Sequence, residues 1–326
     1  MKLAIIGSYG HVDVVLSGLE HAPDVELAGV ARWGGPDGLG FVGIGPAANV
    51  PVFDDFRKML EEVRPDVAAV FTPFAMLAET ATAAAEAGCH VFMEKPVALT
   101  RADLAALRAA VDRAGVRLAA CLAMRGEAPF LTIRRAVADG RIGTVLHAAA
   151  QKSYPFNRRD AFYRTRESYG GTIPWIGIHA LDFIHFCTGQ DYRRVAAMAD
   201  NLAHPSHPGM EDQGALIAEL SGGGTAVVRF DYLRPLGRAE RPWGDDRLRL
   251  AGTGGIIETR DGAVTLTTPD AAESLPLEKP VNVFADFAAA LAGGAEPMIG
   301  TDESFRMTEV ALAARDAQDS GKVIEV

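Results

Sequence analysis

The chain has 326 residues, which at about 150 residues per domain suggests two domains. Lys and Arg number 32 and Asp and Glu 42, and the resulting formal charge of −10 argues against nucleic acid or an anionic membrane as a partner. The longest uncharged run, Gly38 to Phe53, is broken by Gly and Pro and is shorter than the roughly 20 apolar residues of a bilayer span.

The first part of the chain alternates short apolar runs with helical patterns. Apolar runs without polar alternation are typical of strands buried on both faces, and their alternation with helices predicts a parallel sheet with right-handed crossovers. Strands are expected at Lys2–Ile6, Val25–Ala31, Asp66–Phe71, His90–Met93 and Arg117–Leu122. Helices are expected at His11–His21, from Asp54 or Asp55 to Val63, at Met76–Gly88 and at Arg101–Ala114.

After a helix at Glu127–Gly140 the pattern changes to short strands joined by turns with Gly and Pro. These strands are expected at Val145–Lys152, Val195–Leu202, Gly214–Leu220, Thr225–Tyr232, Arg247–Leu250, Ile256–Thr259 and Ala263–Thr267. Further helices are expected at Trp175–Phe186, Val281–Ala292 and Asp302–Ser320. The patterns predict an α/β protein: a domain with a doubly wound parallel sheet over 1–122, and an α+β domain with a mostly antiparallel sheet over 123–326. The closing helices are able to pack back on the first domain.

A turn with two glycines follows the first strand, and it reads Gly7-Ser8-Tyr9-Gly10-His11-Val12. Dinucleotide sites use glycines at this place so that backbone amides approach a pyrophosphate. The usual pattern is Gly-x-Gly-x-x-Gly/Ala, but Tyr9 takes the second glycine position and Gly10 comes one residue late. Because a side chain at that position is expected to crowd the pyrophosphate, the turn by itself favours nucleotide binding no more than a plain strand-to-helix turn.

Arg32 lies just after the second expected strand, where a carboxylate usually binds the ribose hydroxyls of NAD. A guanidinium there suits the 2′-phosphate of NADP. The expected cofactor is therefore NAD or NADP, and Arg32 favours NADP. The alternative is that Arg32 is a solvated surface charge.

A family resemblance is carried by two segments, 64–73 and 87–98. In the second segment, Glu94-Lys95-Pro96 directly follows an expected strand. Further matches are Arg125, the turn at 140–143, Gly170-Gly171, and Gly177 to Asp182. The sequence resembles the family of glucose–fructose oxidoreductase, inositol dehydrogenase and rhizopine-catabolism proteins over essentially the whole chain. The resemblance implies a Rossmann domain over 1–122 and an open sheet in the C-terminal domain. It also implies an NAD(P)-dependent oxidoreductase acting on a sugar, sugar acid or cyclitol, and a homodimer or homotetramer formed through the C-terminal sheet.

The resemblance also implies site residues. Lys95 would lie beside the nicotinamide and the substrate next to a cis-prolyl turn at Pro96, Glu94 would place Lys95 or the nicotinamide ribose, and Thr72 and Pro73 would line the cofactor site. His179 would face the nicotinamide and deprotonate the substrate. The chemistry fits, because a desolvated ammonium can polarise a hydroxyl and an imidazole titrates near neutral pH. The alternatives are a surface charge at Lys95 and a core histidine at His179.

Two positions depart from the family pattern. Dehydrogenases of this family usually have an Asp four residues before the histidine, but this chain has Trp175, which can stack on a sugar and cannot transfer a proton. Phe74 follows Thr72-Pro73, where Asn and His are frequent. Asp182 lies on the same helical face as His179, so it is expected either to orient the histidine and bind substrate or only to stabilise the helix.

A basic segment runs from Lys152 to Arg166, and a second group is formed by Arg234, Arg238 and Arg241. Arg158 and Arg164 are candidates for binding a carboxylate or phosphate on the substrate, against the alternative of a solvated face or an ion-pair patch between subunits. His204, His207, Glu211 and Asp212 resemble metal ligands only superficially, because prolines make their segment a turn, so no metal is expected.

Other functions remain open at this point. One is a sugar lyase or glycoside-cleaving enzyme that oxidises its substrate transiently with a tightly held NAD. Another is a non-catalytic ligand-binding member of the family, which Tyr9, Phe74 and Trp175 would favour. Three widely spaced cysteines and the absence of a signal-peptide pattern at the N-terminus predict a cytoplasmic protein.

Overall fold

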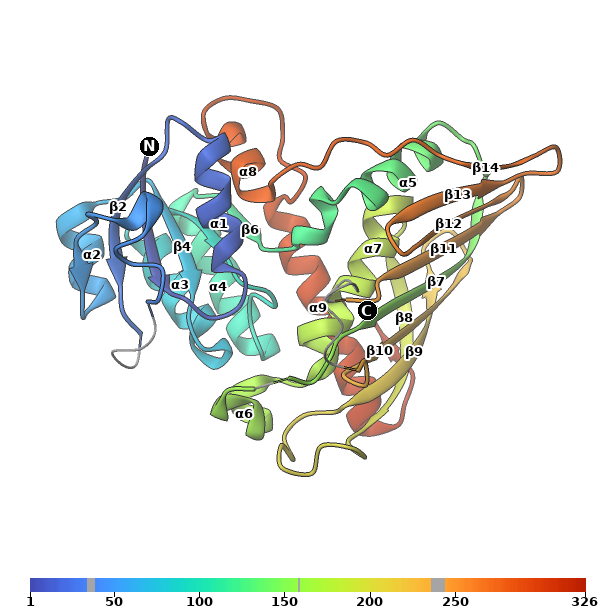
Figure 1. The fold of residues 1–326 in the computed structure, drawn as a ribbon. Helices are drawn as coiled ribbons and strands as arrows, with labels where there is room; N and C mark the ends of the chain where they lie inside the picture. Colours follow the sequence, from blue (N-terminus) through green and yellow to red (C-terminus); the bar gives the residue numbers. More distant parts are fainter. Residues whose placement is uncertain (34–38, 158, 236–243) are drawn as a thin grey trace. The chain divides into compact units, whose positions relative to one another are not determined.

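A computed structural model describes residues 1–33, 39–157, 159–235 and 244–326. The chain divides into two units, both drawn in Figure 1. The first unit contains Met1–Ala123 and Asn282–Thr308, and the second contains Met124–Val281 and Glu309–Val326. Arg158, Arg238, Arg241 and part of the glycine-rich segment 34–45 lie outside the described residues.

The first unit is built on a six-stranded parallel sheet with the strand order β3-β2-β1-β4-β5-β6, the order of a doubly wound nucleotide-binding fold. This confirms the predicted parallel sheet. All five residues of β4 are buried, as expected for a strand covered on both faces. The strands are β1 Lys2–Gly7, β2 Glu26–Ala31, β3 Val52–Phe53, β4 Val67–Phe71, β5 His90–Met93 and β6 Leu118–Ala120.

Side-chain caps fix several helix starts in this unit. Asp55 accepts a hydrogen bond from the amide of Arg57 at 2.8 Å and Thr100 accepts one from Asp103 at 3.1 Å, so each satisfies an amide that the helix leaves free. Asn282 caps α8 and also donates to the carbonyl of Val14 at 2.9 Å. The helices are α1 Val12–Gly18, α2 Phe56–Val63, α3 Leu77–Glu86, α4 Arg101–Ala114, α8 Val283–Leu291 and the start of α9 Thr301–Ser320.

The second unit contains a nine-stranded sheet with the order β14-β13-β12-β11-β7-β10-β9-β8-β15. Only β7 and β10 pair in parallel and the other neighbours are antiparallel, which confirms the predicted open, mostly antiparallel sheet. The strands are β7 Val145–Ser153, β8 Tyr192–Asp200, β9 Gln213–Leu220, β10 Thr225–Asp231, β11 Arg247–Gly252, β12 Ile256–Arg260, β13 Ala263–Thr267, β14 Ala272–Ser274 and β15 Ile324–Glu325.

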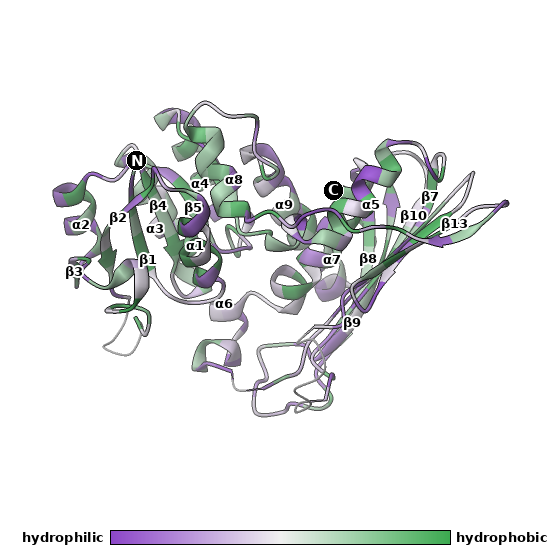
Figure 2. Ribbon diagram, turned by 45° about the horizontal axis from the view of Figure 1, so that its top comes forward, coloured by the Kyte–Doolittle hydropathy of each residue, from purple (hydrophilic) through white to green (hydrophobic). Residues whose placement is uncertain are grey.

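Helices cover one face of this sheet (Figure 1). Helix α5 (Ala128–Ala138) contacts β12 and β13, and α7 (Ile178–Thr188) contacts β7 and β10. Residues of β10 alternate between exposed and buried, the pattern of a strand with one face toward a core. The other face exposes apolar side chains, among them Met198 at 85%, Ile217 at 54% and Val227 at 38%. Figure 2 shows hydrophobic and hydrophilic residues mixed along these strands.

Some elements differ from the sequence expectation. Strands β3, β14 and β15 have only two or three residues, too few to show a period. The helix expected to begin at Trp175 begins instead as a π-helix at Ile173–Gly177, which continues into α7, and a short helix α6 (Arg166–Tyr169) precedes it. Cys89, Cys121 and Cys187 are free and buried. In the described parts of the chain, no helix combines the length and the apolar character needed to cross a bilayer.

Candidate functional site

The glycine turn lies at the carboxyl end of β1 in the first unit. Gly7 has φ +77°, and a Cβ there would collide with the carbonyl of Phe71 at the end of β4. The amide of Tyr9 donates to that same carbonyl at 2.8 Å. The turn is therefore bound to the neighbouring strand through backbone atoms, and only glycine fits at position 7.

Gly10 makes room for a carboxylate. It has φ +79°, and a Cβ there would overlap Oε2 of Glu94. Oε2 accepts hydrogen bonds from the backbone amide of His11 at 2.7 Å and from its ring Nδ1 at 2.8 Å, while Oε1 accepts one from the amide of Lys95 at 2.8 Å. The displaced glycine that departs from the usual pattern thus allows Glu94 to join the turn to the end of β5.

Glu94 is fully buried, with an exposed fraction of 0%. Burial raises the pKa of the Glu94 carboxyl, but the charge and hydrogen bonds of His11 and the charge of Lys95 outweigh it and hold that pKa below its usual value. Glu94 is therefore ionised at neutral pH. An ionised carboxylate only accepts hydrogen bonds, so His11 donates from Nδ1.

Lys95 is a buried cation that follows the carboxyl end of β5. Its side chain is 1% exposed, its Nζ lies 4.0 Å from Oε1 of Glu94, and its peptide bond to Pro96 is cis. Because β1, β4 and β5 are neighbours in one parallel sheet, the glycine turn, Thr72 and Lys95 follow strand ends at the same edge. Open α/β sheets bind ligands along this edge.

The residues of this edge fit a dinucleotide. Thr72 is 0% exposed, and its hydroxyl oxygen has no hydrogen-bond partner among the described residues, which leaves a polar atom for a ligand beside the glycine turn. Pro73 follows it and opens a short 3₁₀ turn at Phe74–Met76. Ser8 and Val12 are partly exposed. At the end of β2, Arg32 lies 3.5 Å from the carboxylate of Asp54 and its side chain is 38% exposed.

In the second unit, His179 lies on α7 directly after the π-helix, and it is 2% exposed. π-Helices are rare and occur often at functional sites. Trp175 lies inside the π-helix, 7% exposed, with its ring edge-on to Tyr163 at a centroid distance of 6.4 Å. The structure thus places Trp175 in the packed helix start, and its predicted contact with substrate stays a prediction.

Asp182 forms a buried ion pair with Arg125. Its Oδ1 accepts hydrogen bonds from Arg125 Nη2 at 2.7 Å and Nε at 3.1 Å, and both side chains are 1% exposed. The guanidinium also lies 5.1 Å from the ring centroid of Phe186. This pair ties α7 to the segment before α5. Of the two roles expected for Asp182, the observed contacts favour stabilisation of the helix.

The cations of the basic segment contact different partners among the described residues. Arg159 stacks over the ring of Tyr232 at 4.5 Å, Lys152 pairs with Asp246 at 2.6 Å, and Arg164 is exposed. Arg158 lies outside the described residues. Anion binding by Arg158 and Arg164 therefore stays a prediction.

The expected turn at His204–Asp212 is held by its own residues. Asp212 Oδ2 accepts the amide of Leu202 at 3.0 Å and lies 3.3 Å from His204 Nδ1. Asn201 donates to the carbonyls of His204 and His207 at 3.0 and 2.8 Å. Within the described ranges, no group of three or more His, Cys, Asp or Glu is arranged to hold a metal ion.

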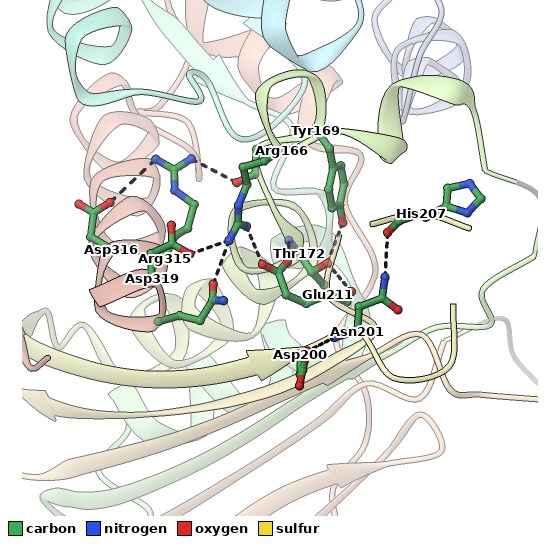
Figure 3. A network of polar contacts seen from close by, with 12 residues as sticks. Arg166, Tyr169, Thr172, Asp200, Asn201, His207, Glu211, Arg315, Asp316 and Asp319 are labelled. Atoms are coloured by element: carbon green, nitrogen blue, oxygen red, sulfur yellow. Dashed lines mark hydrogen bonds and ion pairs between the residues drawn. The ribbon is translucent and has the colours of Figure 1, made fainter. Parts of the chain in front are cut away.

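The sequence patterns do not predict the cluster formed by Arg166, Glu211 and the turn at Gly171. Arg166 and Glu211 form a 2.6 Å ion pair, and Glu211 also holds the residue that follows Gly171, as Figure 3 shows. In the sequence, Glu211 stands out only beside Asp212, as an apparent metal ligand. The Gly170-Gly171 pair was the one available signal, because two glycines before a helix indicate a turn that another group must approach closely.

Comparisons with known proteins agree with both units. Residues 1–121 match the model of an oxidoreductase family with an NAD-binding Rossmann fold, and residues 130–258 match the GFO/IDH/MocA C-terminal domain. D-apiose dehydrogenase of Paraburkholderia graminis is 30% identical over 268 residues, which cover 74% of this chain and 68% of that protein. 1,5-Anhydro-D-fructose reductase of Ensifer adhaerens is 27% identical over 80% of each chain.

A solved structure of a Thermotoga maritima protein matches all of this chain and all of its own, with a TM-score of 0.92 and 32% identity. The two family models together account for most of the chain. The protein therefore belongs to the GFO/IDH/MocA family of oxidoreductases, and its first 121 residues carry the NAD-binding Rossmann fold of that family.

Proposed function

We propose that this enzyme transfers a hydride between a nicotinamide cofactor and a hydroxyl-bearing carbon of a sugar, sugar acid or cyclitol. The observation that carries the proposal is Lys95, a buried cation next to Glu94 at the ligand-binding edge of a parallel sheet. The names of the two curated relatives, a dehydrogenase of D-apiose and a reductase of 1,5-anhydro-D-fructose, support a sugar-like substrate. In this proposal residues 1–122 bind the cofactor and residues 123–326 bind the substrate.

Bound NAD(P) supplies the hydride acceptor or donor on its nicotinamide ring. The chain's own residues manage the proton of the substrate hydroxyl. We assign Lys95 to polarise the substrate oxygen through its ammonium, and His179 to take or return the proton, because an imidazole exchanges protons near neutral pH. Glu94 keeps the ammonium of Lys95 in place through its charge.

The finer cofactor assignment concerns Arg32. Its guanidinium at the end of β2 suits a 2′-phosphate, and the carboxylate of Asp54, which lies 3.5 Å from it, is 96% exposed and easily exchanged. We propose that NADP binds at least as tightly as NAD. Titrating each cofactor against intrinsic protein fluorescence tests this, and a clear preference for NAD would refute it.

The substrate contacts are assigned to the second unit. Trp175 would offer a ring face to a sugar, Asp182 would assist through its pairing with Arg125, and Arg158 and Arg164 would bind an acidic group on the substrate. If the substrate KM is unchanged in both Arg158→Ala and Arg164→Ala, these arginines do not bind an acidic group on the substrate.

We also propose that the protein is a homodimer or homotetramer that associates through the uncovered face of the nine-stranded sheet. The support is the apolar side chains on that face, Met198, Ile217 and Val227, which a monomer would leave in water.

A second candidate function follows from Trp175. Tryptophan replaces the carboxylate that usually takes part in proton transfer with the histidine. In this second candidate the enzyme oxidises its substrate only transiently, and a group is cleaved or eliminated before the hydride returns to the substrate. This candidate predicts that NAD stays bound through purification and that no net NADH forms.

The deciding experiment releases the nucleotide from purified protein, identifies it by mass spectrometry, and then follows NAD(P)H absorbance with a panel of sugars, aldonates and cyclitols. Net NAD(P)H formation supports the dehydrogenase. Product formation without NAD(P)H supports the second candidate. Failure to bind either cofactor would reject both and leave a non-catalytic binding protein.

Lys95→Met checks the assignment of the catalytic cation. We expect kcat to fall by about 100-fold or more, because the loss of one group that stabilises charge on the reacting oxygen typically costs that much. Lys279→Met, which removes an exposed lysine from the second unit, serves as the matched control and should keep the wild-type rate. An unchanged kcat in Lys95→Met would overturn the assignment.

A further inference from the structure

The turn before the π-helix in the second unit is held by several polar side chains. Gly170 and Gly171 have φ values of +83° and +102°, and a Cβ on Gly171 would overlap the guanidinium of Arg166. Thr172 follows and is 0% exposed. Gly171 therefore leaves room for Arg166, and the backbone enters the π-helix at Thr172.

Glu211 holds Thr172 at two points. The amide of Thr172 donates to Glu211 Oε2 at 2.7 Å, and the Thr172 hydroxyl donates to the backbone carbonyl of Glu211 at 2.6 Å. The amide at a helix start has no partner inside the helix, so a carboxylate there satisfies it and prevents the first turn from shifting. Tyr169 adds a 3.3 Å hydrogen bond to the same hydroxyl and a 2.8 Å bond to Tyr232.

Glu211 is itself fixed by charge. It is only 5% exposed, and its Oε1 pairs with Arg166 Nη1 at 2.6 Å. Arg166 Nη2 in turn donates to Asp319 at 2.6 Å and to Gln318 at 3.2 Å on the last turns of α9. Figure 3 shows Arg166 between Glu211 and Asp319. A buried carboxylate with this many partners has one geometry available to it.

The consequence appears seven residues later, at His179. The π-helix Ile173–Gly177 begins directly after Thr172 and continues into α7 without a break. Because π-helices are rare and occur mostly as single turns inside α-helices, we take such a segment to depend on its surroundings to stay in place. The position of Thr172 therefore sets the position of the first turn of α7, where His179 lies.

We propose that Glu211 is a positioning residue for His179, acting through Thr172 and the start of the π-helix. The inference rests on the proposed role of His179 in proton transfer. Glu211 is distant from His179 in the sequence, and it reaches the helix of His179 through the amide and hydroxyl of Thr172.

Glu211→Gln tests the proposal. Glutamine keeps the size of the side chain but offers one acceptor oxygen where the carboxylate offers two, so it cannot hold Thr172 and Arg166 together. We expect kcat to fall about 100-fold, as a displacement near 1 Å does, while the Kd for NAD(P) stays unchanged. The midpoint of the His179 imidazole titration, followed by NMR in the full-length protein, should shift, and the pH profile of kcat should shift with it.

Glu273→Gln is the matched control. It breaks another 2.6 Å Arg–Glu pair, that of Arg141 with Glu273 on β14, away from the turn. This variant should keep both kcat and the His179 titration. Thr172→Val serves as a second test if Glu211→Gln does not fold, because it removes the hydroxyl with its bonds to the Glu211 carbonyl and to Tyr169 but keeps the bond from the Thr172 amide to the Glu211 carboxylate. We expect it to lower kcat and to shift the His179 midpoint in the same direction by a smaller amount.

A folded Glu211→Gln or Thr172→Val variant with the wild-type kcat and the wild-type His179 midpoint would overturn the proposal. The NMR measurement needs no substrate, so it decides the positioning role even if the wild-type protein oxidises none of the tested sugars. An active wild type with unaffected variants would reject the positioning role and leave the proposed function standing.

Discussion

Glu94 connects three residues that the sequence patterns treat separately: two in the glycine turn and one after β5. It binds the amide and ring of His11, it binds the amide of Lys95, and it occupies the space that Gly10 leaves free. One carboxylate thus fixes both the turn expected to face the pyrophosphate and the lysine expected to face the substrate. The shifted glycine is a requirement of this arrangement.

Replacing Glu94 with Gln should weaken cofactor binding and stability together. The glutamine amide leaves at least one buried N–H of the turn without an acceptor, which costs about 1–3 kcal/mol. Fluorescence titration with NAD(P) and urea unfolding measure the two effects. Glu79→Gln, which breaks an exposed pair with Arg57, should change neither. Wild-type affinity and stability in Glu94→Gln would refute this role.

The stability effect should depend on pH. Since the folded state holds the pKa of Glu94 below its ordinary value of 4.5, this carboxylate stabilises the fold above that pH and loses its contribution as the pH falls through the folded-state value. The stability difference between wild type and Glu94→Gln should therefore be largest near neutral pH and shrink in acid. Urea unfolding across this range checks the sign, and a gap that widens in acid would contradict it.

At the scale of elements, the Arg125–Asp182 pair anchors α7. Asp182→Asn leaves the Arg125 guanidinium buried without its counter-charge, so we expect the free energy of unfolding to fall by about 3–5 kcal/mol. Asp139→Asn, which breaks an exposed pair with Arg135 on α5, should cost no more than about 0.5 kcal/mol. A small loss in Asp182→Asn, with a raised KM instead, would return Asp182 to the substrate site.

The long elements were predictable because they carry a period or a cap. Helix α4 begins after Thr100 as expected, and the buried strand β4 is one uniform apolar run. The π-helix at Ile173–Gly177 was not predictable from the sequence, because its composition resembles that of the α-helix that follows it. Its start is held by Glu211, which lies far away along the chain. The hydrogen bond between Thr172 and Glu211 spans 39 residues, and local sequence patterns carry no information about such a pairing.

At the scale of the whole molecule, the uncovered sheet face invites a test of association. Ile217 lies on β9 between β10 and β8, and it is 54% exposed. Ile217→Arg places a charge in the proposed interface, so we expect sedimentation velocity to show a monomer. Leu277→Arg, at a residue that is 48% exposed and outside the sheet, should keep the wild-type assembly. An unchanged assembly in Ile217→Arg would place the interface elsewhere.

The three buried cysteines give each unit its own reporter of local opening. Cys89 and Cys121 belong to the first unit and Cys187 to the second. Burial raises the pKa of the Cys89 thiol to about 11 and raises the pKa of the other two as well, so the reactive thiolate is scarce in the folded protein. Alkylation must then wait for a transient unfolding event. The rate at which each thiol is alkylated therefore measures how often its own unit opens, without any engineered label.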